Sequence, residues 1–205
     1  MTDAVPLRAL ALVCSLKPSP APSSSDLIAR QVLEELGSHG VTGSVVRVVD
    51  HDVRPGVEVD MGDGDAWPGI REQILAADIF VLATPIWMGH PSSITQRVLE
   101  RLDADLAETD NEGRPIMYGK VAIIAVVGNE DGAHKTVADT QQGLNDVGFT
   151  LPAQGATYWV GEAMQTVDYK DLDSVPEKVA ATTAGAARNA AHLARLLTAS
   201  PYPAG

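Results

Sequence analysis

A tryptophan stands between a proline and a glycine in the segment Thr84–Gly89, which directly follows the apolar run 79–83. Trp87 offers an aromatic face, Pro85 has no N–H to give to a neighbouring strand, and Gly89 lets the backbone approach a flat ligand closely. We therefore expect Pro85 to end a buried strand and the segment to form one wall of a site for a planar heterocycle. The alternative is an ordinary strand-to-helix loop with a buried tryptophan.

A second segment, 14–25, is rich in serine and proline and carries one cation, Lys17. It precedes a helical pattern, and the free N–H groups at a helix N-terminus favour a phosphate. Serine hydroxyls can donate to phosphate oxygens, and Lys17 supplies positive charge. Because the segment has neither a G-x-G-x-x-G nor a Walker A pattern, dinucleotide and ATP sites are disfavoured. The alternative is a plain helix N-cap next to a solvated turn.

A third segment, 128–134, is polar and rich in glycine. Gly128 and Gly132 let the backbone approach a ligand, and the polar groups between them can read the edge of a heterocycle. His134 is the one plausible proton donor of the three segments, and it could instead steady negative charge on a reduced ring. The alternative is a capping or solvated histidine. Further along the chain, the aromatic residues of 157–159 either cover the site, fill an interface or pack in the core.

Other kinds of chemistry find little support in the sequence. Cys14 is the single cysteine, which excludes an internal disulfide and a cysteine-rich metal or iron–sulfur site, and a small buried side chain is the better reading of it. The remaining histidines have no metal-ligand spacing, so no metal site is expected. Ser15 is not part of a G-x-S-x-G pattern, which disfavours a hydrolase.

The composition limits the class of protein. The chain has 205 residues, a net charge of −12 and 45% hydrophobic residues, which suits one domain with a sizeable core. The pI of about 4.7 argues against a nucleic-acid or anionic-membrane surface. No apolar stretch has transmembrane length, and the first residues lack the basic region of a signal peptide, so we expect a cytoplasmic protein.

Apolar runs alternate with helical patterns along the chain, which predicts an α/β protein with a parallel sheet and helices on both faces. We expect a single flavodoxin-like domain over 1–205, with a doubly wound five-stranded sheet in the order 2-1-3-4-5. The acid-rich loop 50–68 is long for a connection and is expected to be functional or mobile. The expected strands are 7–14, 44–49, 79–83, 120–127 and part of 149–158, and the expected helices are 26–36, 70–77, 92–102, 136–147 and 175–198.

The order Thr-Pro-x-aromatic-x-Gly at residues 84–89 resembles the ring loop of the flavodoxin-like NAD(P)H-dependent FMN reductases and quinone reductases. The serine-rich and glycine-rich segments match that family's phosphate loop and pyrimidine-side loop. In the phosphate loop, lysine replaces the family's arginine, and three prolines and two extra residues are present. The resemblance implies bound FMN, NADPH or NADH as electron donor, and these contact residues: Ser15, Lys17, Ser23, Ser24, Pro85, Ile86, Trp87, Met88, Gly89, Gly128, Asn129, Gly132 and His134.

Two classes of function follow from this resemblance. The first is an oxidoreductase that passes a hydride from NAD(P)H through FMN to a quinone or a similar small acceptor. The second is a flavodoxin-type FMN electron carrier that meets protein partners through its acidic surface. A flavodoxin-like fold that has lost its cofactor is a third possibility. The aromatic residues on the loops, together with the resemblance, also suggest a homodimer or homotetramer.

Overall fold

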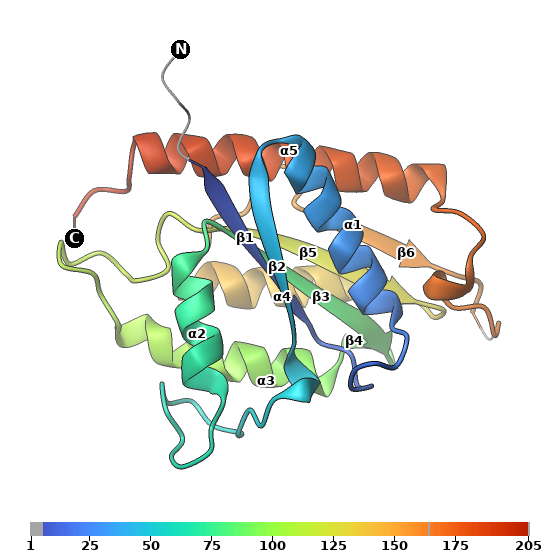
Figure 1. Cartoon of the computed structure of the whole chain (residues 1–205), viewed down its shortest axis with the longest axis horizontal. Coiled ribbons are helices and arrows are strands. Elements are labelled where there is room, and N and C mark those ends of the chain that lie inside the picture. Colours follow the sequence, from blue (N-terminus) through green and yellow to red (C-terminus); the bar gives the residue numbers. More distant parts are fainter. Residues whose placement is uncertain (1–5, 164, 205) are drawn as a thin grey trace.

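Five parallel strands form the centre of the protein, whose computed structural model describes residues 6–163 and 165–204. The strands lie side by side in the order β2-β1-β3-β5-β6 (Figure 1). This is the predicted flavodoxin-like order, because β4 is only a short antiparallel addition to β3. The strands are β1 (Leu7–Val13), β2 (Val41–Arg47), β3 (Ile79–Trp87), β5 (Val121–Gly128) and β6 (Ala156–Val160).

Helices cover both faces of this sheet, as predicted (Figure 1). Alternate residues of each strand point to opposite faces, so the buried side chains divide into two cores. Small alanines on one side of α5 let that long helix pack closely on the sheet. One face carries α1 (Ser24–Ser38) and α5 (Glu177–Ala199), and the other carries α2 (Trp67–Ala76), α3 (Ser93–Leu102) and α4 (Ala133–Val147).

Pro85 does not end its strand, which corrects the expectation from the sequence. β3 continues to Trp87, and Pro85 pairs with Val127 of β5. The backbone carbonyl of Ala83 points towards β1 and accepts from the N–H of Cys14. Backbone direction repeats every second residue of a strand, so the backbone of Pro85 also faces the β1 side of β3. Pairing with β1 ends at Ala83, and a proline is tolerated there because no partner strand needs its missing N–H.

A tight hairpin follows this strand. Trp87 pairs with His90 in β4 (His90–Pro91), and Met88 and Gly89 form the two-residue turn between them. Both turn residues have positive φ, 53° at Met88 and 74° at Gly89, as the two-residue turns that suit the strand twist require. The N–H of Met88 donates to the Glu130 carboxylate over 2.7 Å, which ties the turn to the loop after β5.

Several other boundaries differ from those expected. The second strand begins at Val41, directly after the turn at Gly40, and residues Val48–Asp50 form a short 3-10 helix instead of its end. The fifth parallel strand spans Ala156–Val160, so residues 157–159 lie inside it and do not follow it. Two further 3-10 helices, Asp103–Ala107 and Tyr169–Asp171, lie outside the helices expected from the sequence.

The long acid-rich loop is held in place by a buried ion pair. The guanidinium of Arg101 in α3 lies 2.7 Å from the carboxylate of Asp65, and both side chains are fully buried. Arg101 also donates to three backbone carbonyls of the loop, those of Arg54, Glu58 and Val59. Burial alone would raise the pKa of Asp65, but Arg101 and backbone N–H groups outweigh it and hold that pKa well below its ordinary value.

Candidate functional site

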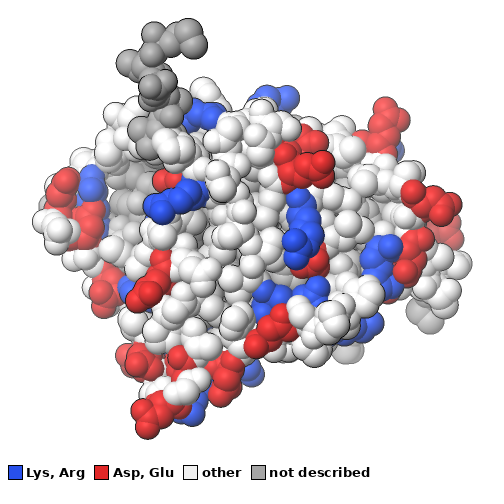
Figure 2. Space-filling view, in the orientation of Figure 1, with Lys and Arg blue, Asp and Glu red and all other residues white. Residues whose placement is uncertain are grey.

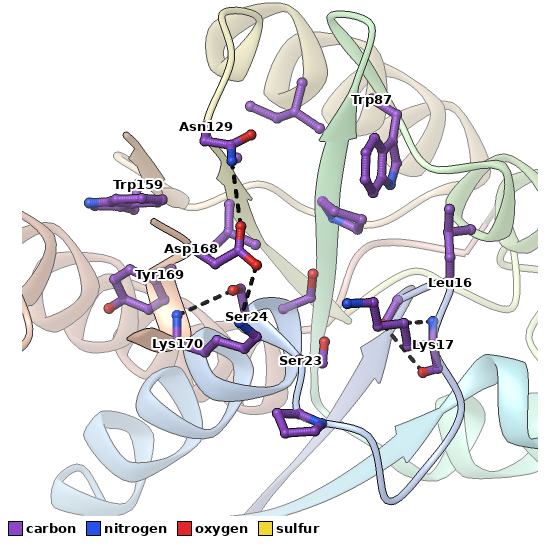
Figure 3. Close-up of a pocket in the computed structure, with 17 residues that line it drawn as sticks. Leu16, Lys17, Ser23, Ser24, Trp87, Asn129, Trp159, Asp168, Tyr169 and Lys170 are labelled. Carbon is purple, nitrogen blue, oxygen red and sulfur yellow. Dashed lines mark hydrogen bonds and ion pairs between the residues drawn. The ribbon is translucent and has the colours of Figure 1, made fainter. Parts of the chain in front are cut away.

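The three segments singled out in the sequence meet at one cleft at the carboxyl end of the sheet (Figure 3). The cleft has a volume of about 690 Å³, its open mouth included. Open α/β sheets bind their ligands at this edge, where the connections of neighbouring strands diverge. The cleft is lined by Ser15, Leu16, Lys17, Pro22, Ser23, Ser24, Ser25, Pro85, Ile86, Trp87, Val127, Gly128, Asn129, Trp159, Asp168, Tyr169 and Lys170.

The N-terminus of α1 forms the polar end of the cleft. The hydroxyl of Ser23 caps the helix by accepting from the N–H of Asp26 over 3.3 Å, and Ser24 and Ser25 occupy its first turn. N–H groups of a first helical turn have no partner within the helix, and they attract an anion. The predicted Ser15, Lys17, Ser23 and Ser24 all line this end.

The proline-rich loop that leads to α1 is braced by the end of β2. Arg47 donates to the carbonyl of Ala21 over 2.8 Å, and Asp50 accepts from the N–H of Ser19 over 2.7 Å. The N–H of Lys17 donates to the hydroxyl of Ser15 over 3.1 Å. These contacts fix the backbone of a loop that lacks the glycines of the common phosphate-binding motifs.

The apolar part of the cleft is built on the ends of β3 and β5. Pro85, Ile86 and Trp87 line it from β3, and the Trp87 side chain is 55% exposed at its mouth (Figure 3). A Cβ atom at Gly128 would stand 2.9 Å from the Ile86 side chain, so the floor of the cleft needs a glycine there. Trp159 lines the opposite side, which agrees with one of the three roles considered for the aromatic segment.

A buried hydroxyl network supports this wall from below. Thr84 accepts from the hydroxyl of Thr95 over 2.7 Å and from the N–H of Ser92 over 3.2 Å. The hydroxyl of Ser92 donates to the carbonyl of Cys14 at the end of β1 over 2.7 Å. The network therefore ties the ring wall to the strand that leads into the serine-rich loop. Burial raises the pKa of the Cys14 thiol to about 12, so it is a neutral packing group at neutral pH.

Four of the residues implied by the family resemblance lie outside the lining of the cleft: Met88, Gly89, Gly132 and His134. Met88 is 89% exposed at the tip of the hairpin. Gly89 and Gly132 instead allow the hairpin and the loop after β5 to touch, because a Cβ atom at Gly132 would lie 2.6 Å from the Cα atom of Gly89. The expected homo-oligomer rests on Trp87, Met88, Tyr158 and Trp159, of which Trp87, Met88 and Tyr158 are exposed, and it stays a prediction.

His134 lies on α4, which begins one residue earlier, at Ala133. Its Nε2 atom is 2.9 Å from the hydroxyl of Tyr158, and the two rings meet edge to face. The histidine thus packs against β6 and not into the cleft.

We expect His134→Ala to leave the dissociation constant for FMN and the rate of flavin reduction unchanged, because neither His134 nor its partner Tyr158 lines the cleft. Flavin fluorescence quenching and stopped-flow absorbance measure the two quantities, with Tyr158→Phe as the matched control that keeps the ring but removes the hydrogen bond. A large loss of the reduction rate in His134→Ala, but not in Tyr158→Phe, would support His134 as a proton donor or as a group that steadies the reduced ring.

The cleft also contains residues that sequence reasoning missed. Asp168, Tyr169 and Lys170 belong to a polar stretch after β6 that showed no periodic pattern, so nothing local pointed to them. The Tyr169 ring lies 5.5 Å from the Trp159 ring, centroid to centroid, and extends that wall. Ser25 also went unnoticed, although it is the third serine of a run that had been assigned to phosphate binding. The other unpredicted lining residues are Leu16, Pro22 and Val127.

This arrangement fits a flavin mononucleotide. Serines, two lysines and a helix N-terminus suit a phosphate at one end, and proline, isoleucine and tryptophan suit a flat ring at the other. No histidine or cysteine lines the cleft in the part of the chain that the structure describes, so neither a Ser–His nor a Cys–His pair stands on its walls. Within residues 6–163 and 165–204 there is no cluster of ligands for a metal ion, and no helix is both long and apolar enough to cross a bilayer.

Comparisons with known proteins also point to a flavin. The chain is 32% identical over 210 residues to 8-demethyl-8-aminoriboflavin-5′-phosphate synthase of Streptomyces davaonensis, a match that covers 96% of the chain and 80% of that protein. The structure of RosB with bound 8-demethyl-8-formylriboflavin-5′-phosphate superposes with a TM-score of 0.86 at 31% identity, over 96% of this chain and 82% of that one.

A third relative is much longer than this chain and matches it over only part of its own length. The divalent metal cation transporter MntH of Mycobacterium bovis is 36% identical over 172 residues, which is 82% of this chain, but the chain spans only 25% of that protein's length. The family of NADPH-dependent FMN reductases matches residues 7–165, which include all three predicted segments. The chain therefore belongs to the NADPH-dependent FMN reductase family.

Proposed function

We propose that the protein is an FMN-dependent oxidoreductase that takes a hydride from NADPH or NADH and passes the electrons to a quinone or a similar small acceptor. Its family is NADPH-dependent and named for FMN, and the parts of the cleft match the parts of that cofactor. The observation that carries the proposal is the open ring end of the cleft, where half-exposed Trp87 leaves room for a second planar molecule beside the wall.

The residues of the chain would bind and orient in this reaction. FMN, when bound, supplies the hydride chemistry. The α1 N-terminus with its serines would hold the phosphate, which sets how deep the ring reaches. Pro85, Ile86 and Trp87 would keep water from one side of the ring, and the polar side chain of Asn129, which also lines the cleft, would face its far edge. Positioning of this kind lowers a barrier without an acid or base, and the cleft offers no obvious pair for such a role.

The other function considered, a flavodoxin-type FMN electron carrier that serves protein partners, has less support. A carrier of that kind docks through a patch of one charge sign. Figure 2 shows Lys and Arg side chains interspersed with Asp and Glu on the face in view, so the excess of negative charge is not gathered into a single patch there.

A second candidate function is chemical modification of the flavin itself. It is favoured by the similarity to the aminoriboflavin-phosphate synthase over nearly the whole chain and by the flavin phosphate bound in the RosB structure. In that case the same cleft would hold a flavin 5′-phosphate as substrate and release an altered flavin.

Rapid mixing of the FMN-loaded protein with NADPH or NADH separates these functions. For the oxidoreductase we expect the visible absorbance of the oxidised flavin to bleach in one fast phase and to return when a quinone is added. Bleaching by neither nucleotide would contradict the proposal. Mass analysis of the flavin after prolonged incubation with air, amino donors and the protein tests the second candidate, which requires a new flavin mass.

A further inference from the structure

The polar stretch after β6 forms a wall of the cleft that is fastened to the opposite end of the chain. We call residues 165–172 the strap. The hydroxyl of Tyr169 donates to the side chain of Gln31 in α1 over 2.6 Å, and the N–H of Lys170 donates to the hydroxyl of Ser24 over 3.2 Å. The side chain of Asn129 donates to the carbonyl of Gln165 over 3.1 Å. The strap is therefore fixed against both the first helix turn and the loop after β5.

Lys170 brings a positive charge to the polar end of the cleft (Figure 3). Its ammonium lies 3.1 Å from Asp168 and 2.6 Å from Asp171, and its side chain is only 21% exposed. The hydrogen bond to Asp171, with a further one to Asp168, raises the pKa of Lys170 against the opposing effect of burial. The hydrogen bond from Lys170 and the more distant charge of Lys17 both lower the pKa of Asp171.

Ser25 supplies an independent sign that a polar ligand belongs at this end. The residue is only 2% exposed, and it lines the cleft directly beside Ser24. Its hydroxyl has no hydrogen-bond partner among the residues that the structure describes, whereas the hydroxyls of Ser23 and Ser24 both accept from backbone N–H groups. The Ser25 hydroxyl is not one of the buried side-chain atoms without a partner, so it is open to the cleft, where a phosphate oxygen would accept from it.

We propose that Lys170 is the residue that selects the 5′-phosphate of the flavin, and that it exchanges its contact with Asp168 for the phosphate when the flavin binds. This inference rests on the proposed function and deepens it, because it names what lets the site distinguish FMN from riboflavin. The sequence pointed to Lys17 for this role, but Lys17 is on a loop outside the helix, whereas Lys170 is fastened to the first turn of α1 through Ser24.

The proposed exchange of Asp168 for phosphate at Lys170 is testable, because the Asp168 carboxylate lines the same cleft and has the same sign of charge as a phosphate. A phosphate monoester carries close to two negative charges above a pKa of about 6. Asp168 would repel it and compete for Lys170, while Asp171 keeps its own contact outside the cleft lining. Removing the charge of Asp168 should thus strengthen FMN binding, and removing the charge of Lys170 should weaken it.

The experiment measures dissociation constants for FMN and for riboflavin by fluorescence quenching, without nicotinamide nucleotide. For Lys170→Met we expect the FMN constant to rise by roughly 10- to 100-fold, as for a lost hydrogen bond between charged groups, and the riboflavin constant to stay the same. Lys170→Arg should retain FMN binding. Asp168→Asn should lower the FMN constant and leave that for riboflavin unchanged. Lys178→Met and Asp173→Asn, exposed residues outside the cleft lining, are the matched controls.

Two results would overturn the proposal. One is an equal loss of FMN and riboflavin binding in Lys170→Met, which would mean that the residue only shapes the strap. The other is a Lys170→Met protein whose dissociation constant for FMN is unchanged but whose KM is higher for NADPH and not for NADH. That result would assign Lys170 to the 2′-phosphate of NADPH. If the expected preferences appear but neither nucleotide reduces the flavin, the oxidoreductase function fails and the role of Lys170 stands.

Discussion

Arg101→Met is expected to lower the free energy of unfolding by about 3–5 kcal/mol, because it leaves the buried carboxylate of Asp65 without its partner. The replaced guanidinium also serves three loop carbonyls and lies 5.5 Å above the ring of Trp67, so several groups lose a contact together. Urea denaturation of the flavin-free protein, followed by far-UV circular dichroism, measures the change.

Arg97→Met is the matched control for this prediction. Arg97 lies one turn earlier in the same helix and makes a single hydrogen bond to the same loop, to the carbonyl of Val53 over 3.1 Å. Its loss should cost about 1 kcal/mol. The double variant Arg101→Met/Asp65→Leu should recover part of the stability, because no unpaired charge remains. Equal effects of the Arg97 and Arg101 variants would show that the ion pair does not hold the loop.

The ion pair also predicts how stability depends on pH. The pKa of Asp65 is lower in the folded protein than in the unfolded chain, so folding favours its ionised form. The resulting stabilisation is fully present above the unfolded pKa of about 3.9 and is lost as the pH falls towards the folded pKa. The wild-type protein should therefore lose more stability than Asp65→Asn when acidified below about pH 4.

Gly132→Ala is expected to slow flavin reduction by about tenfold or more, because a displacement near 1 Å at a reacting centre can cost up to about 10²-fold. The new Cβ atom would lie 2.6 Å from the Cα atom of Gly89 and 3.0 Å from its carbonyl group. Backbone on both sides cannot yield as a flexible side chain would, so the hairpin that carries Trp87 must move. Stopped-flow absorbance of the FMN-loaded variant measures the rate.

Gly113→Ala separates this clash from backbone strain. Gly113 also has a positive φ, 79°, but a Cβ atom there would meet nothing within 4 Å. It should cost about 1 kcal/mol of stability through the left-handed conformation alone and leave the reduction rate unchanged. A Gly132→Ala protein with a normal rate and normal FMN affinity would show that contact between the hairpin and the loop after β5 does not set the ring wall.

Much of the fold was predictable because its signals are local. The alternation of apolar runs, such as those at β3 and β5, with helical patterns indicated parallel strands joined by helices, and hence the order of the strands. The prediction that Pro85 ends its strand was wrong because a proline is tolerated inside β3 only where β1 no longer pairs with it. The sequence around Pro85 does not show where β1 ends. Arg101 has the same appearance in the sequence as any polar residue of an amphipathic helix, so its burial was not foreseen.

The candidate site was predictable in part for the same reason. Residues at or directly after the end of a strand, such as Trp87 and Ser15, must reach the carboxyl edge of a parallel sheet, and both line the cleft. His134 lies only a few residues beyond such an edge, but α4 has begun by then and turns its ring towards Tyr158. Lys170 was missed because its contact with Ser24 joins residues 146 positions apart.

The long span of the strap's contacts also bears on how the protein is made. A chain is synthesised from its N-terminus and tends to fold in that order. Ser24 leaves the ribosome long before Lys170, and the contact between Tyr169 and Gln31 closes a loop of 138 residues. A nascent chain that ends before the strap would hold the serines of α1 and the hairpin of Trp87 but lack one wall of the cleft. We therefore expect the cleft to be completed late in folding, after the strap has been synthesised.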